Sequence, residues 1–105
     1  MGGMKFLVIE RAVVPRLPSD PKERERVITE HYYYLKKLSD EGKILHHSFI
    51  GTPGGVNIVD VESHVELDKL MMSFPRFPYC NYEVYPLLTI DEAIDCLHSI
   101  YPKKE

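Results

Sequence analysis

The sequence has no tryptophan, only two cysteines and no long apolar run. Cys80 and Cys96 are too few for the disulfide framework of a small secreted scaffold, so we expect two free thiols in a reducing compartment. The apolar run at residues 6–9 is interrupted by Glu10 and Arg11. It is far shorter than the roughly 20 residues that span a bilayer. We therefore predict a cytoplasmic protein that does not bind membranes.

A surplus of basic residues is also missing. Thirteen Lys and Arg stand against sixteen Asp and Glu, for a formal net charge of -3. Nucleic-acid binding depends on neutralising phosphates, so this balance argues against it. No C-x-x-C pair or zinc-ligand spacing is present, so we predict no metal site. The glycines at 51–55 lack the phosphate-loop pattern and are typical of a hairpin turn.

What the sequence does contain is the composition of one globular domain. It has 105 residues, of which 44% are hydrophobic and 28% are charged. We assign residues 1–105 to a single domain and expect flexible ends at 1–3 and 102–105. Strands are predicted over 5–14, 43–50, 56–61 and 80–88. Helices are predicted to open at the capping residues Asp20, Ser63 and Thr89, the first of them ending near Glu41 before Gly42.

The order of these elements is strand, helix, strand, strand, helix, strand, and then an extra helix. This order predicts an α+β fold of the ferredoxin-like βαββαβ type, with an antiparallel four-stranded sheet plus a C-terminal helix. Both helices of the repeat fall on one face of the sheet, which leaves the other face bare. A bare apolar face is usually covered by a second sheet, so we expect a dimer.

Several of these segments together resemble the muconolactone Δ-isomerase family. The residues that carry the resemblance are Val14-Pro15-Arg16, Asp20-Pro21, Gly42-Lys43, His46, the run from Val56 to Ser63, Leu67, Leu70, the run from Phe74 to Tyr79, and the run from Glu83 to Leu87. They span roughly residues 4 to 88. The resemblance implies a dimeric α+β barrel, with dimers assembled further into decamers. It also implies a cofactor-free double-bond shift in muconolactone, an anionic lactone, during the degradation of aromatic compounds.

The sequence departs from this family at two places. The isomerases carry a basic residue a few positions after the strand histidine, where this chain has His47-Ser48-Phe49. They also carry an acidic residue next to Glu30, where this chain has His31. Two other functions therefore stay open beside the isomerase. One is a non-catalytic oligomeric protein that binds small ligands, and the other is a different cofactor-free enzyme on the same barrel.

A 1,3 proton shift requires a base whose pKa lies near the operating pH. Glu30 and His31 lie in the middle of the first predicted helix, and His31 shares an apolar stripe with Val27 and Leu35. We name His31 and Glu30 as candidate catalytic residues. The alternatives are a hydrogen-bonded core histidine and a solvated surface glutamate.

His46 is the third candidate catalytic residue. It neighbours His47 on a predicted strand, so the two side chains point to opposite faces and cannot chelate one metal together. The resemblance favours His46 as the pocket residue, because it matches the strand histidine of the family. The alternative is a histidine at an interface or a sheet edge.

Three further residues are candidates for substrate binding. Arg76 lies between two prolines, in a stiff loop that suits a cation for a substrate carboxylate. Tyr34 lies on the His31 side of its helix and offers a hydroxyl, and Tyr79 closes the loop. The alternatives are packing for the two tyrosines and a surface ion pair for Arg76.

Overall fold

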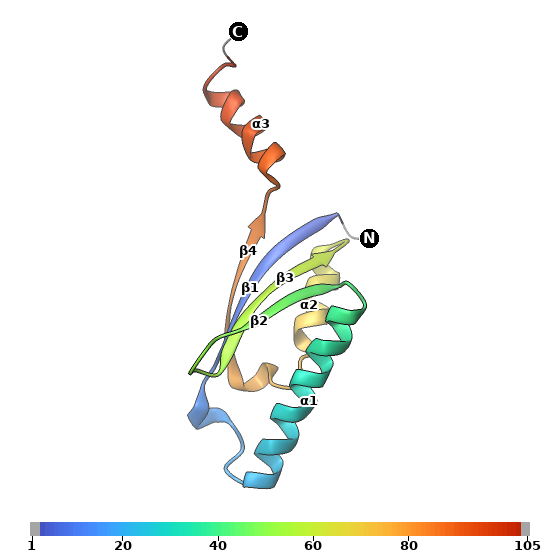
Figure 1. The fold of residues 1–105 in the computed structure, drawn as a ribbon, viewed down its shortest axis with the longest axis vertical. Coiled ribbons are helices and arrows are strands. Elements are labelled where there is room, and N and C mark those ends of the chain that lie inside the picture. The colour runs from blue at the N-terminus through green and yellow to red at the C-terminus, as the bar shows by residue number, and fades with distance from the viewer. Residues whose placement is uncertain (1–2, 104–105) are drawn as a thin grey trace.

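The computed structural model describes residues 3–103 as a four-stranded sheet with three helices (Figure 1). The strands are β1 (Met4–Ala12), β2 (Ile44–Ser48), β3 (Gly54–Val61) and β4 (Cys80–Leu87), and the helices are α1 (Pro21–Asp40), α2 (His64–Met72) and α3 (Ile90–Ile100). Two short 3-10 helices, η1 (Val14–Arg16) and η2 (Phe77–Tyr79), lie in the connections. Of the ends expected to be flexible, residues 1–2 and 104–105 lie outside the described range.

The strands pair antiparallel in the order β2-β3-β1-β4. This is the strand order of the ferredoxin-like arrangement, and α1 and α2 cover the same face of the sheet (Figure 1). The predicted α+β fold with a C-terminal helix is therefore confirmed. The dimeric barrel stays a prediction, because the structure holds one chain.

Helix α1 begins and ends where its capping residues predict. The Asp20 side chain accepts a hydrogen bond from the backbone N–H of Glu23 at 3.0 Å, and Pro21 occupies the first turn. After the helix, Gly42 adopts a φ of 75°, which is favourable for a residue without a Cβ. The buried residues of α1 recur at steps of three and four; they are Val27, His31, Leu35 and Leu38.

The first strand is shorter than predicted. Val13 and Val14 were expected to continue it, but β1 ends at Ala12, and Val14 begins η1. Pro15 explains the difference, because a proline has no N–H to donate to a neighbouring strand and its fixed φ suits a helical turn.

The core lies between the sheet and the two helices α1 and α2. Alternate residues of each strand face it, as a pleated strand requires. Phe6 and Val8 of β1 are 5% and 0% exposed, and Val59 of β3, which pairs with Phe6, is also 0% exposed. The remaining buried apolar residues of this cluster are Leu35, Leu38, Ile44, Val61, Leu67, Met71 and Phe74.

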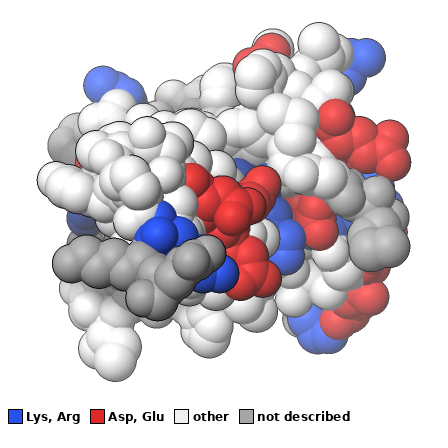
Figure 2. Space-filling model, turned by 90° about the horizontal axis from the view of Figure 1, so that it is seen from above, with Lys and Arg blue, Asp and Glu red and all other residues white. Residues whose placement is uncertain are grey.

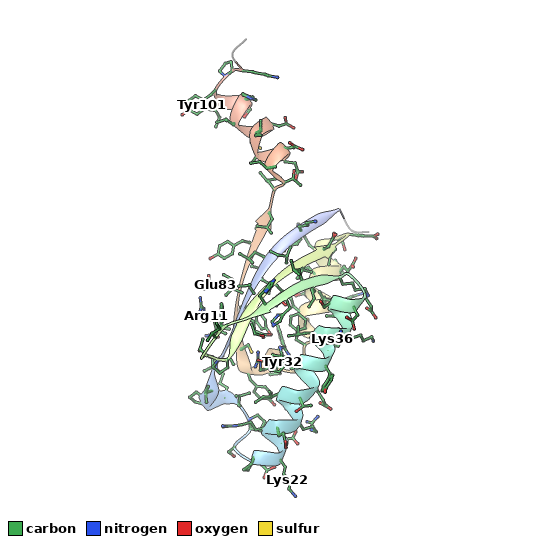
Figure 3. All side chains as sticks on the ribbon, in the orientation of Figure 1. Arg11, Lys22, Tyr32, Lys36, Glu83 and Tyr101 are labelled. Carbon is green, nitrogen blue, oxygen red and sulfur yellow. The ribbon has the colours of Figure 1, made fainter. Side chains whose placement is uncertain are left out.

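The opposite face of the sheet carries apolar side chains that no helix or strand within residues 3–103 covers. Leu7 of β1 pairs with Ile58 on one side and with Tyr85 on the other, which places all three on this outer face. Tyr85 is 49% exposed. Arg11 and Glu83 rim the same face, and Figure 3 shows both on the side of the sheet away from α1.

Helix α3 leaves the end of β4 and projects beyond the sheet (Figure 1). None of its residues is buried, and its apolar side chains Ile94 and Leu97 are 42% and 49% exposed. The projection makes the molecule elongated, with extents of 64 × 26 × 22 Å. Within residues 3–103, no helix combines the length and the apolar character that crossing a membrane requires.

The α1 cap gives a first prediction. We expect Asp20→Ala to lower the free energy of unfolding by about 1 kcal/mol, because the Glu23 N–H loses its acceptor. Urea unfolding measures this change. Ser19→Ala, at the neighbouring exposed position, is the matched control and should leave the midpoint unchanged. Equal effects of the two substitutions would contradict the capping role of Asp20.

Candidate functional site

Strand β1 brings a carboxylate into the core. Phe6, Val8 and Glu10 are alternate residues, so they face the helices together, and the Glu10 side chain is 0% exposed. Burying a charged group is costly unless partners compensate it. The partners of Glu10 therefore identify the polar centre of the molecule.

Three side chains from three other elements converge on this carboxylate. Arg76 Nη2 donates to Oε1 at 2.7 Å, and the Tyr82 hydroxyl donates to Oε2 at 2.7 Å. His31 Nε2 lies 2.9 Å from Oε1. We call Glu10, His31, Arg76 and Tyr82 the Glu10 cluster. It joins β1, α1, the loop before η2, and β4.

The prediction that His31 faces the sheet is confirmed, because its side chain is fully buried. Its second ring nitrogen is also engaged: the backbone N–H of Arg76 donates to Nδ1 at 3.2 Å. A backbone N–H only donates, so Nδ1 carries a lone pair and the ring proton lies on Nε2, facing Glu10. Both nitrogens of His31 thus have protein partners.

Arg76 is held inside the molecule. It is 2% exposed, and its guanidinium lies 5.3 Å from the ring centre of Tyr32, which Figure 3 places between α1 and the sheet. Within the described part of the chain, its Nε has no hydrogen-bond partner. Arg76 therefore lies in the interior, where Glu10 balances much of its charge.

The environment sets the ionisation of Glu10. Burial raises the pKa of this carboxyl, but the hydrogen bonds from His31, Arg76 and Tyr82 outweigh it and lower the pKa from 4.5 to about 2. Burial and the neighbouring Glu10 carboxylate raise the pKa of the Tyr82 phenol. Glu10 is therefore an anion at neutral pH and Tyr82 is a neutral donor.

His46 belongs to a second polar group, which we call the His46 cluster, with Ser48 and Asn57. His46 Nδ1 lies 2.7 Å from Asn57 Oδ1, and its Nε2 lies 2.7 Å from Ser48 Oγ. Asn57 is 0% exposed, whereas His46 is only half-buried and Ser48 is exposed. His46 is therefore a histidine that a ligand can reach.

The two clusters lie on adjacent rows of the same sheet face. Gly55 is the register partner of both Glu10 and Ser48. A Cβ on Gly55 would lie 2.8 Å from Cε1 of His46. The imidazole of His46 thus occupies the space that a side chain at position 55 would fill, on the helix-facing side that carries Glu10.

The structure does not bring Glu30 to these clusters. Glu30 is exposed on α1 and pairs with Arg26 at 2.7 Å, as expected of a solvated helical glutamate. Acidic and basic side chains also lie side by side on the face shown in Figure 2. Tyr34 and Tyr79 are half-buried; the Tyr34 ring lies edge-on to Phe74 at 6.0 Å, and Tyr79 ends η2.

Glu10 and Asn57 are functional candidates that the sequence analysis missed. Strand alternation is the signal that indicates them. Glu10 continues the core-facing series of Phe6 and Val8, and Asn57 opens the series of Val59 and Val61. A polar residue at such a position has to find partners inside the fold.

A cavity of about 500 Å³ lies elsewhere, where α3 leaves the body. Lys5 and His64 line it together with the end of β4, and none of the residues of the two clusters does. Among residues 3–103, no group of three or more His, Cys, Asp or Glu side chains is placed to hold a metal ion.

The fold and the two clusters define a small α+β protein whose polar side chains gather on the helix-covered face of its sheet. The sequence model of the family "Muconolactone delta-isomerase" matches residues 4–92. The chain belongs to the muconolactone Δ-isomerase family.

Individual relatives agree with this family. A muconolactone Δ-isomerase of Rhodococcus opacus is 36% identical over 83 residues, which cover 78% of this chain and 88% of that protein. One of Cupriavidus pinatubonensis is 36% identical over 69 residues, covering 65% and 68%. A crystal structure of muconolactone isomerase superimposes with a TM-score of 0.74 at 25% identity, covering 82% of this chain and 90% of the other.

The Glu10 cluster predicts how stability depends on pH. A carboxyl whose pKa is lowered by folding stabilises the protein above the unfolded pKa of 4.5, and this contribution disappears as the pH falls toward 2. The shift from 4.5 to about 2 corresponds to about 3 kcal/mol. We expect Glu10→Gln to destabilise the protein by about 3 to 5 kcal/mol at pH 7, since it leaves Arg76 buried without its carboxylate.

Urea unfolding at pH 7, 5 and 3 measures this difference. The gap between the wild type and Glu10→Gln should narrow as the pH falls below 4.5. Glu25→Gln, at an exposed position of α1, removes the same charge and is the control. A gap that stays constant from pH 7 to 3 would show that the charge of Glu10 contributes nothing to the fold.

Proposed function

We propose that this protein catalyses the 1,3 proton shift that isomerises muconolactone or a closely related anionic lactone, without a cofactor and in the cytoplasm. The family match over residues 4–92 is the observation that carries the proposal. The relatives in Rhodococcus opacus and Cupriavidus pinatubonensis bear the name of that activity.

The geometry ranks the three candidate bases. Glu30 is exposed and paired with Arg26, and both ring nitrogens of His31 bind protein groups. His46 is half-buried, and among residues 3–103 the one hydrogen-bond partner of its Nε2 is the exposed hydroxyl of Ser48, which a substrate can displace. We therefore propose His46 as the residue that moves the proton, with His31 as the residue that holds the Arg76 loop against Glu10.

The proposed reaction uses one face of the substrate. His46 Nε2 removes a proton from the ring carbon that bears the carboxymethyl side chain, at the far end of the conjugated system, and returns it to the ring carbon next to the carbonyl. Negative charge develops on the carbonyl oxygen during the transfer. A hydroxyl such as that of Tyr34 is suited to donate a hydrogen bond to this oxygen.

Binding of the substrate carboxylate is proposed for Arg76 and Tyr79. The unpartnered Nε of Arg76, counted over residues 3–103, supports this role. Because Arg76 is 2% exposed, binding of a substrate carboxylate there requires the side chains around Arg76 to move apart. Fixed positions of the reacting groups and exclusion of water would then supply most of the rate enhancement.

Proton NMR of muconolactone in deuterated buffer tests the reaction. The wild type should convert it to the enol-lactone with uptake of deuterium. His46→Gln should lower kcat about 100-fold or more, because the proton carrier is lost, whereas Glu30→Gln should stay within about twofold. A fully active His46→Gln protein would refute the role of His46. No conversion by folded wild type would instead favour a ligand-binding protein.

We further propose that the protein is a homodimer whose subunits meet through the outer sheet face. The uncovered apolar residues Leu7, Ile58 and Tyr85 support this arrangement, since burying them removes apolar area from water. The resemblance to the isomerases extends the same proposal to a decamer.

Light scattering after size exclusion measures this assembly. Ile58→Lys should release monomers, because a lysine in the centre of the contact would be buried without a partner. Val65→Lys, at an exposed position of α2 on the opposite side, should leave the mass unchanged. A monomeric wild type, or equal effects of the two substitutions, would contradict the proposed interface.

A further inference from the structure

Asn57 occupies a position where the fold calls for an apolar side chain. It lies on the core-facing side of β3, in the series continued by Val59 and Val61, and its register partners are Val8 and His46. Its amide is 0% exposed. A buried amide is unfavourable unless hydrogen bonds compensate it, so the hydrogen-bond partners of Asn57 indicate the role of its side chain.

The Asn57 amide is directed at one group. Its Oδ1 lies 2.7 Å from Nδ1 of His46. Its Nδ2 has no partner among residues 3–103. An amide that only stabilised the core would be expected to form hydrogen bonds through both its oxygen and its nitrogen. The Asn57 amide is fully buried and forms a single hydrogen bond, to a histidine that a ligand can reach.

That bond decides which nitrogen of a neutral His46 carries the proton. An amide oxygen only accepts, so with the amide oriented as in the structure, Nδ1 is the donor and Nε2 holds the lone pair. A free imidazole side chain prefers the opposite tautomer, with the proton on Nε2. A histidine in that form has no lone pair on Nε2 and cannot act as a base there.

We propose that Asn57 is a positioning residue that holds His46 in the Nδ1–H tautomer and thereby makes Nε2 the basic nitrogen. The catalytic consequence rests on the proposed function of His46 as the proton carrier. Asn57 itself does not touch the substrate in this account, because it acts through the imidazole.

Two neighbours complete the arrangement. The Ser48 hydroxyl lies 2.7 Å from Nε2 and can donate to its lone pair, so it marks the position that a substrate proton would take. Gly55 leaves room for the ring, since a Cβ there would lie 2.8 Å from His46 Cε1 and 2.5 Å from the carbonyl oxygen of His47. A glycine at position 55 therefore leaves the space that the His46 ring occupies.

Long-range ¹H–¹⁵N correlation spectra of histidine-labelled protein test the proposal directly. The spectrum reports which ring nitrogen carries the proton, and His46→Gln identifies the His46 signals. For neutral His46 in the wild type we expect a protonated Nδ1 and an unprotonated Nε2. A wild type with the proton on Nε2 overturns the proposal without any variant.

Two substitutions then test the cause. Asn57→Leu fills the same space without an acceptor and should move the proton of His46 to Nε2. Asn57→Asp restores an acceptor and should keep it on Nδ1. An unchanged tautomer in Asn57→Leu, with thermal unfolding showing that the protein is folded, would overturn the role of Asn57; if this variant does not fold, the wild-type and Asn57→Asp spectra decide.

Kinetics separate this proposal from the proposed function. If the wild type isomerises muconolactone, Asn57→Leu should lower kcat about tenfold or more with little change in KM, and Asn57→Asp should recover most of it. A shifted tautomer with unchanged kcat would overturn the positioning role. If the wild type shows no isomerisation, the proposed function fails, and the tautomer in the spectra still decides whether Asn57 positions His46.

Discussion

The carboxylate of Glu10 is the constraint on which the interior of this protein depends. It is fully buried, and it stays ionised because Arg76, His31 and Tyr82 approach it from three separate elements. Removing one partner of such a group leaves a charge in the core, which costs far more than the pair contributes in its intact form. The cluster therefore fixes the position of α1, β4 and the loop before η2 relative to β1.

The positions of the other functional groups follow from this arrangement. His31 accepts the backbone N–H of Arg76, so the loop that carries the proposed carboxylate-binding cation is tied to α1. Gly55 lies between Glu10 and Ser48 in the register, and the absence of a side chain there leaves room for the imidazole of His46. His31 thus stabilises the fold through its two hydrogen bonds, whereas the half-buried His46 can be reached by a substrate.

Periodicity predicts much of this fold because it reports on local geometry. The stripe of α1 placed His31 toward the sheet, and strand alternation also indicates Glu10 and Asn57 as core-facing. Glu30 is adjacent to His31 in the sequence, but this does not place the two side chains in one site. Successive helical residues point about 100° apart, and Glu30 faces solvent. The bond between Arg76 and Glu10 spans 66 positions, and no local pattern encodes such a contact.

The most direct test of this account is a crystal structure with a saturated lactone acid that binds but cannot isomerise. The account predicts the ligand on the helix-facing side of the sheet, with its carboxylate at Arg76 and its ring carbons within hydrogen-bonding distance of His46 Nε2 in place of Ser48. Glu10 should keep its partners. A ligand seated on the outer face, or in the cavity beside Lys5 and His64, would contradict the assignment of the site.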